Sequence, residues 1–173
     1  NTFLMYLQGG RGVLVEPNPA YTSLLRDGRP GDTVLNIGIG ITDETEADFY
    51  VFDEHSQLNT FSKEWADKYI AEYGPAILKE VVKMPLVNIN RVLEEHFQAG
   101  PHIFSIDVEG LDYDILKTLD FERFRPSLFC VETGVFGSFN INEGIPALMA
   151  EQGYVMRANT YTNSIFIDEA LLG

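Results

Sequence analysis

Short apolar runs alternate with stretches of helical periodicity along this chain. The clearest apolar run covers residues 102–106, between Gly100-Pro101 and Gly110, and predicts a buried strand. Apolar residues at helical spacing over 111–119 then predict an amphipathic helix. The intervening segment Asp107-Val108-Glu109-Gly110 therefore lies at the C-terminal end of a core strand. In open α/β sheets this is the edge where ligands bind.

The same reasoning assigns the other elements. Helices are predicted over 1–7, 19–28, 62–73, 91–97, 111–119 and 143–152, and strands over 13–15, 33–41, 48–52, 77–87, 102–106, 127–133, 154–161 and 164–167. Pro85 favours an edge position for its strand, and Asn90 is the expected cap of helix 91–97. This order predicts an α/β fold with a mostly parallel sheet, helices on both faces and a C-terminal antiparallel hairpin.

Composition limits the possible functions. With 173 residues, 45% of them hydrophobic, the chain suits a single domain over 1–173. Its net charge of -14 disfavours nucleic acid and anionic membranes, which require clustered Lys and Arg. The charge is compatible with a neutral or cationic small molecule, or simply with solubility.

The single cysteine, Cys130, has apolar neighbours and is expected in a buried strand. It has no partner for an intramolecular disulfide, so a reducing cytoplasm fits. The sequence contains neither a signal-peptide h-region nor an apolar run long enough to span a membrane.

Glu16 is the first candidate binding residue. It follows the predicted strand 13–15, and Asn18 and Pro19 behind it have the chemistry of a helix N-cap and first helical position. A nucleotide-binding α/β fold uses an acid at such a strand tip to accept hydrogen bonds from ribose hydroxyls. A solvated loop glutamate explains the position about equally well, so the position alone leaves both interpretations open.

Gly38-Ile39-Gly40 matches the start of a dinucleotide-binding glycine motif only in part. Position 43 is Asp instead of the third glycine, and strand-like alternation over 48–52 follows instead of a helix. We therefore predict a strand, a polar turn over 42–46 and a returning strand, and no phosphate loop.

Four motifs occur in a fixed order along the chain. They are Gly12-Val13-Leu14-Val15-Glu16-Pro17-Asn18-Pro19, Ile39-Gly40-Ile41-Thr42-Asp43, Asn59-Thr60-Phe61, and Ile106-Asp107-Val108-Glu109-Gly110 leading to Asp114-Ile115-Leu116. With the terminal hairpin, they resemble the FkbM family of S-adenosylmethionine-dependent methyltransferases over almost the whole chain. The resemblance implies a Rossmann-like class I methyltransferase sheet. It also implies O-methylation of a small-molecule hydroxyl, on a sugar or a secondary metabolite.

The resemblance also implies which residues bind the cofactor. Glu16, followed by Pro17, would bind the ribose hydroxyls of S-adenosylmethionine, and Ile39 and Gly40 would line the adenine. Members of the family begin this site with a strand and a glycine-rich turn, which hold the methionine end of the cofactor. This sequence lacks them ahead of the helix that starts at Asn1. We therefore expect an N-terminally truncated chain, with a gap between the strands at 13–15 and 103–106.

Asp107 and Glu109 would lie where the methyl group meets its acceptor. Methyl transfer needs a positioned hydroxyl and a group that takes its proton, so Asp107 is the first candidate base and Glu109 the second. A divalent metal held by these two acids and Glu132 could assist, but no histidine joins them and no metal site is predicted. Capping of a helix N-terminus explains Glu109 and Asp112 at least equally well.

Two other functions compete with methyl transfer. The missing glycine-rich turn also fits a non-catalytic binding or assembly module that kept the fold without the cofactor. A nicotinamide-dependent oxidoreductase also carries an acid after its second strand, but the terminal hairpin and the insertion after Ile41 count against it. Because a fold alone does not define a function, methylation rests on the family resemblance.

Overall fold

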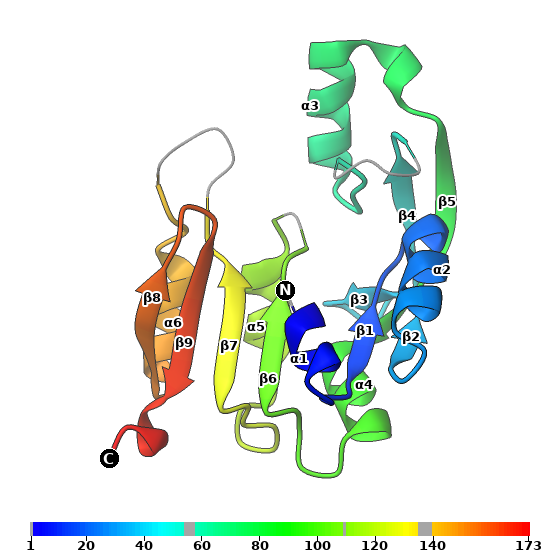
Figure 1. The fold of residues 1–173 in the computed structure, drawn as a ribbon. Coiled ribbons are helices and arrows are strands. Elements are labelled where there is room, and N and C mark those ends of the chain that lie inside the picture. Colours follow the sequence, from blue (N-terminus) through cyan, green and yellow to red (C-terminus); the bar gives the residue numbers. More distant parts are fainter. Residues whose placement is uncertain (1, 54–57, 109, 135–139) are drawn as a thin grey trace. The chain divides into compact units, whose positions relative to one another are not determined.

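The computed structural model describes residues 2–53, 58–108, 110–134 and 140–173. Contacts within the chain divide it into two compact units, residues 2–88 and residues 89–173. Each unit combines helices with strands, as Figure 1 shows, and each is described here by itself. The division of the chain into one domain or two stays a prediction.

The first unit contains two small sheets. Its elements are α1 (Phe3–Leu7), β1 (Val13–Val15), α2 (Pro19–Gly28), β2 (Thr33–Leu35), β3 (Gly38–Gly40), β4 (Glu46–Val51), α3 (Lys63–Tyr73), a 3-10 turn (Pro75–Ile77) and β5 (Glu80–Asn88). β1 pairs with β2 in parallel, whereas β3, β5 and β4 form a separate sheet in that order. The segment expected as one strand over 33–41 is therefore two strands in two sheets.

β5 is the central strand of its sheet, which corrects two expectations. It pairs in parallel with β3 and antiparallel with β4, so β4 does not return along β3, and Pro85 does not mark an edge. The Leu86 N–H donates to Thr45 O (2.9 Å), and N–H directions alternate along a strand. The Pro85 nitrogen therefore points away from β4, and pairing with β3 begins only at Leu86. No ladder hydrogen bond is lost at the proline.

Local capping explains where the helices of this unit begin. Asn18 Oδ1 accepts a hydrogen bond from the Ala20 N–H (3.0 Å), and Pro19 is the first residue of α2, as predicted. The Ser62 side chain caps α3 in the same way by accepting from the Trp65 N–H (3.3 Å). These two helix starts are confirmed.

The second unit is built on one four-stranded sheet. Its elements are α4 (Ile89–His96), β6 (Ile103–Ile106), α5 (Asp112–Thr118), β7 (Leu128–Glu132), α6 (Gly144–Glu151), β8 (Tyr154–Asn159), β9 (Asn163–Asp168) and a terminal 3-10 turn (Glu169–Leu171). The strand order is β6-β7-β9-β8. Only β6 and β7 run parallel, because the predicted hairpin of β8 and β9 places β9 antiparallel beside β7. The sheet is therefore mixed instead of mostly parallel.

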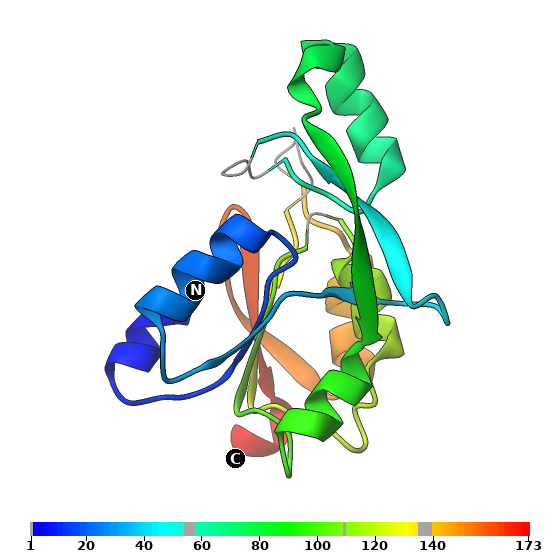
Figure 2. The ribbon, with the colours of Figure 1, turned by 90° about the vertical axis from the view of Figure 1, so that its right-hand side faces the viewer.

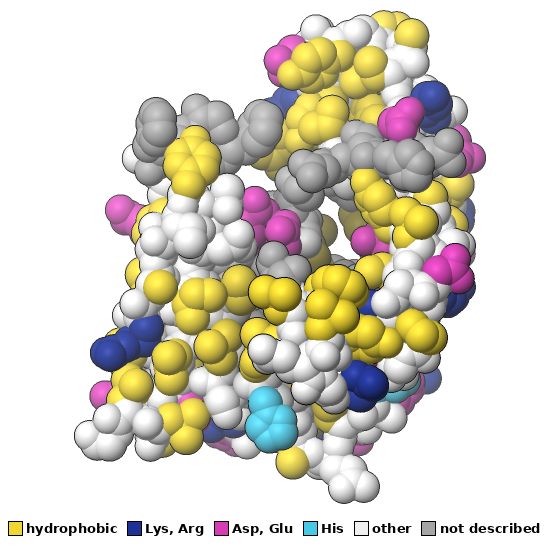
Figure 3. All heavy atoms as spheres, viewed as in Figure 1, with side chains coloured by type: hydrophobic (Ala, Val, Ile, Leu, Met, Phe, Trp, Pro, Cys, Tyr) yellow, Lys and Arg dark blue, Asp and Glu magenta, His cyan; other side chains and the backbone are white. Residues whose placement is uncertain are grey.

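The two faces of this sheet differ. Phe129 and Val131 of β7 are fully buried, and α5 and α6 lie on one face of the sheet, as Figures 1 and 2 show. The opposite face carries half-buried Cys130 and Ile165, so Cys130 is less buried than expected. Apolar side chains are visible on the molecular surface in Figure 3.

One further expectation about this unit is wrong. Asn90 does not cap a helix, because α4 begins at Ile89 directly after β5. The Asn90 side chain instead joins the end of α5 to the next loop: Nδ2 donates to Thr118 O (2.6 Å), and Oδ1 accepts from the Asp120 N–H (2.8 Å). β1 and β6 belong to different units, so the predicted gap between them stays a prediction.

Arg125 stabilises the C-terminal hairpin. Its Nε and Nη2 donate to the two carboxylate oxygens of Asp168, each at 2.7 Å, and Nη1 donates to Gln152 O (3.0 Å). The guanidinium also lies 4.9 Å from the centre of the Tyr154 ring. The Arg125 hydrogen bond lowers the pKa of Asp168, and burial raises the pKa of Tyr154 to about 12.

We expect Arg125→Ala to lower the free energy of unfolding by about 1 to 3 kcal/mol, the usual value of charge-assisted hydrogen bonds. Because the pKa of Asp168 is lower in the folded state, the ionised Asp168 makes its full contribution to the free energy of unfolding above the ordinary pKa of 3.8. The contribution is lost as pH falls through the folded value. Urea unfolding at several pH values measures both effects. Arg157→Ala, at an exposed arginine of β8, is the control and should change stability little.

Candidate functional site

The tip of β1 is held by side chains from two other elements. The Glu16 N–H donates to Leu35 O (3.0 Å), which extends the pairing with β2 by one residue. Asn36, just after β2, donates from Nδ2 to Glu16 O (2.9 Å) and to Pro17 O (2.7 Å). From α2, the buried Thr22 hydroxyl lies 2.9 Å from Glu16 O. The backbone at Glu16 is therefore fixed before any ligand arrives.

The Glu16 carboxylate is half-buried, and one of its oxygens is occupied. Oε1 accepts a hydrogen bond from the Asn18 N–H (2.8 Å), while Oε2 has no partner among the described residues. Burial raises the pKa of Glu16, and the hydrogen bond from Asn18 partly offsets this increase. A carboxylate held in this way can accept hydrogen bonds from ligand hydroxyls.

Packing alone explains the glycines of β3. A Cβ atom at Gly38 would lie 2.5 Å from a ring carbon of Phe61, and one at Gly40 would lie 3.2 Å from Leu86 Cβ. Both glycines are buried, so they allow β3 to approach its neighbours closely. Ile39 between them is half-buried and points to the other face. A role of Ile39 and Gly40 in adenine binding stays a prediction.

Asp107 and Asp112 lie in the second unit, at the turn from β6 into α5. Asp107 directly follows β6 and is exposed, whereas Asp112 is only 4% exposed. Asp112 Oδ1 accepts from the Val108 N–H (3.2 Å), and Oδ2 accepts from the Gly110 N–H (3.3 Å). Asp112 thus organises the turn itself. Glu109, the second candidate base, lies outside the described residues.

Burial raises the pKa of Asp112 to about 6, and the negative charge of Asp107 adds to this increase. The hydrogen bonds from the two turn N–H groups act in the opposite direction but do not cancel the desolvation. The acid therefore titrates near neutral pH.

Other polar groups lie along the same sheet edge. The register pairs Ile106 with Val131 and Glu132 with Asn163, so Asp107, one residue further, follows beside Glu132. Asn163 Nδ2 donates to Thr162 Oγ1 (2.9 Å), and its enclosed Oδ1 has no hydrogen-bond partner among the described residues.

The metal hypothesis receives no support from the part of the chain that can be described. Among those residues no group of three or more His, Cys, Asp or Glu is placed to hold a metal ion. Glu109, which would complete the possible ligand set with Asp107 and Glu132, is not among them. The hypothesis is therefore left open.

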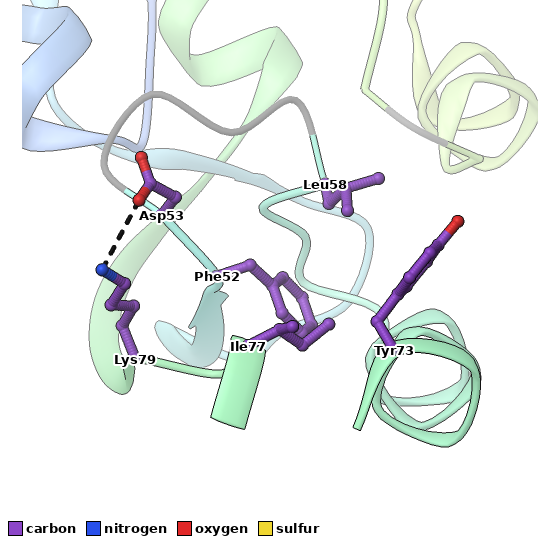
Figure 4. A pocket seen from close by; sticks show the side chains of 6 residues that line it. All are labelled: Phe52, Asp53, Leu58, Tyr73, Ile77 and Lys79. Carbon is purple, nitrogen blue, oxygen red and sulfur yellow. Dashed lines mark ion pairs between the residues drawn. The ribbon is translucent and has the colours of Figure 1, made fainter. Parts of the chain in front are cut away.

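The first unit also contains an apolar cavity of ≈ 410 Å³, shown in Figure 4. Phe52, Leu58, Tyr73 and Ile77 line it, and an ion pair between Asp53 and Lys79 (3.5 Å) lies at its edge. The volume is in the range of small-molecule sites. Its lining supplies few polar groups, so the cavity defines no reaction.

Sequence reasoning missed two contributors to these sites: Asn36 and the turn-forming role of Asp112. A short polar residue after a strand is a weak signal, because turns favour Asn and Asp for many reasons. Asn36 is distinguished by the distant carbonyls that it contacts, and periodicity does not report such contacts. Asp112 contacts N–H groups only two and four residues away, and its burial distinguishes it from other turn residues.

The mixed α/β architecture, with acids at the tips of parallel strands, is consistent with a methyltransferase-like fold. The sequence profile of the Methyltransferase FkbM domain matches residues 1–156. The chain therefore belongs to the FkbM methyltransferase family, as its motifs predicted. No curated protein and no solved structure matches the chain significantly.

Among the described residues, no helix is both long and apolar enough to cross a membrane.

Replacing Asp112 should change how stability depends on pH. Its folded pKa of about 6 exceeds the ordinary 3.8, so ionisation costs the folded state roughly 3 kcal/mol as pH rises between these values. Asp112→Asn cannot ionise, so its stability relative to the parent protein should rise by up to that amount from pH 4 to pH 7. Urea unfolding measures the difference.

Asp114→Asn, at an exposed acid of the same helix, is the matched control and should show no such trend. A stability difference between Asp112→Asn and the parent protein that is constant across pH would contradict the assignment.

Proposed function

We propose that this protein is an S-adenosylmethionine-dependent O-methyltransferase that acts on a small-molecule hydroxyl, on a sugar or a secondary metabolite. The observation that carries the proposal is the Glu16 carboxylate. One oxygen is held by the Asn18 N–H and the other has no partner among the described residues, at a strand tip that three side-chain hydrogen bonds fix. Membership of the FkbM methyltransferase family supports the transfer of a methyl group.

The residues present fit the nucleoside part of the cofactor. Glu16, followed by Pro17, would accept the ribose hydroxyls, and Ile39 and Gly40 would line the base. We assign none of the described residues to the methionine end of the cofactor. Binding should therefore be measured on the longest available form of the chain.

When bound, S-adenosylmethionine supplies a methyl group on a positively charged sulfonium. The protein has to place the acceptor oxygen in line with this group and to remove the hydroxyl proton. We assign the proton to the carboxylate of Asp107, which takes it as the new carbon–oxygen bond forms and the carbon–sulfur bond breaks. Glu109 is the alternative base.

The groups near Asp107 suit a hydroxyl-bearing acceptor. Glu132 follows beside Asp107 along the same edge, and its carboxylate is a hydrogen-bond acceptor. Such an edge favours ligands rich in O–H donors, and it disfavours anions because its acids would repel them. Asp112 supports this arrangement by fixing the turn that carries Asp107.

Glu16→Ala should weaken binding of S-adenosylhomocysteine and S-adenosylmethionine by about 10- to 100-fold, because up to two charge-assisted hydrogen bonds are lost. Isothermal titration calorimetry measures this loss. Glu44→Ala, at an exposed acid of the same unit, should bind like the parent protein. If the longest available chain binds neither ligand, the non-catalytic module becomes the better explanation.

Asp107→Asn should lower the methyl-transfer rate by about 10²- to 10⁴-fold and leave the affinity for S-adenosylhomocysteine unchanged, because it removes only the proton acceptor. The assay follows the formation of S-adenosylhomocysteine. Its acceptor is first identified by screening sugars and hydroxylated metabolites with the parent protein. Asp114→Asn serves as control. An unaffected rate in Asp107→Asn, together with a large loss in Glu109→Gln, would transfer the role to Glu109.

A further inference from the structure

We infer that Asn36 reads the base of the nucleoside: its Oδ1 accepts a hydrogen bond from the exocyclic amino group of adenine. This inference rests on the proposed function, because it concerns the same site as Glu16. It adds a specificity-determining residue that neither the motifs nor the family match identified.

The orientation of the Asn36 amide is fixed by its own hydrogen bonds. Nδ2 has two protons, and these are used by Glu16 O (2.9 Å) and Pro17 O (2.7 Å). The flipped amide would place Oδ1 against two carbonyl oxygens and lose both bonds, so the assignment of oxygen and nitrogen is unambiguous. The group that remains for a ligand is therefore an acceptor.

The remaining oxygen can be reached by a ligand. Asn36 is half-buried, and its Oδ1 has no partner among the described residues and is not an enclosed atom. The residue follows β2 at the edge where Glu16 follows β1, and the two parallel strands are neighbours, about 4.8 Å apart. Asn36 therefore lies beside the acid proposed to bind the ribose, and before Ile39 in the chain.

The chemistry selects one kind of base. Glu16 and Asn36 both present acceptors, so a ligand that spans them needs donors at both positions. Adenosine provides ribose hydroxyls at one end and an amino group at the other. Hypoxanthine has a carbonyl in place of that amino group, which would face Oδ1 and leave both oxygens unpaired.

The test compares S-adenosylhomocysteine with S-inosylhomocysteine, which differ at this group. Calorimetric titration of the parent protein should give tighter binding of the adenine ligand by at least 10-fold. In Asn36→Ala the affinity for S-adenosylhomocysteine should fall, that for S-inosylhomocysteine should fall less, and their ratio should drop at least 5-fold. Asn90→Ala removes a comparable side-chain hydrogen bond in the second unit, from Asn90 Nδ2 to Thr118 O. This variant should leave the ratio of the two affinities unchanged.

Each other outcome has a defined meaning. Equal affinities in the parent protein overturn the inference without any variant, so the test does not depend on the folding of Asn36→Ala. An equal loss for both ligands in Asn36→Ala also overturns it, because Asn36 would then only position the backbone of Glu16. If the parent protein binds neither ligand, the proposed cofactor itself is wrong.

Discussion

The parallel pairing of β1 and β2 is the constraint on which the candidate nucleoside site depends. The pairing is fixed at both ends. At its start, the buried Asp32 accepts from the Gly12 N–H (2.8 Å) and from Arg29 Nε (2.6 Å). At its end, Asn36 binds the backbone of the β1 tip. A slip of one residue would turn every side chain to the opposite face, so these contacts keep Glu16 beside Asn36.

In the second unit, the turn that positions Asp107 lowers the stability of the folded state. The turn after β6 must place Asp107 at the sheet edge, and the structure achieves this by burying Asp112 beneath the turn N–H groups. Burial of an acid that ionises near neutral pH lowers stability, as its raised pKa indicates. Part of the cost of folding is thus concentrated in the turn proposed to carry out the chemistry, as is common in functional sites.

Both candidate sites present oxygen acceptors. Glu16 and Asn36 in the first unit, and Asp107 and Glu132 in the second, all favour ligands that donate hydrogen bonds and carry no negative charge. The overall charge of -14 acts in the same direction over longer distances. The adenosine and sulfonium parts of S-adenosylmethionine meet this requirement, and so does a polyhydroxylated acceptor. The electrostatics of the chain and the proposed reaction are therefore consistent with each other.

The sequence by itself determined the elements that depend on near neighbours. Asn18 and Ser62 cap helices through N–H groups two or three residues away, and the hairpin of β8 and β9 joins adjacent segments. Tertiary structure alone decided the features that depend on distant groups. It placed β5 between β3 and β4 despite Pro85, and it brought Asn36 to the carbonyls of residues about 20 positions earlier. Periodicity and capping are local properties of the chain, whereas strand partners and burial arise only when distant segments meet.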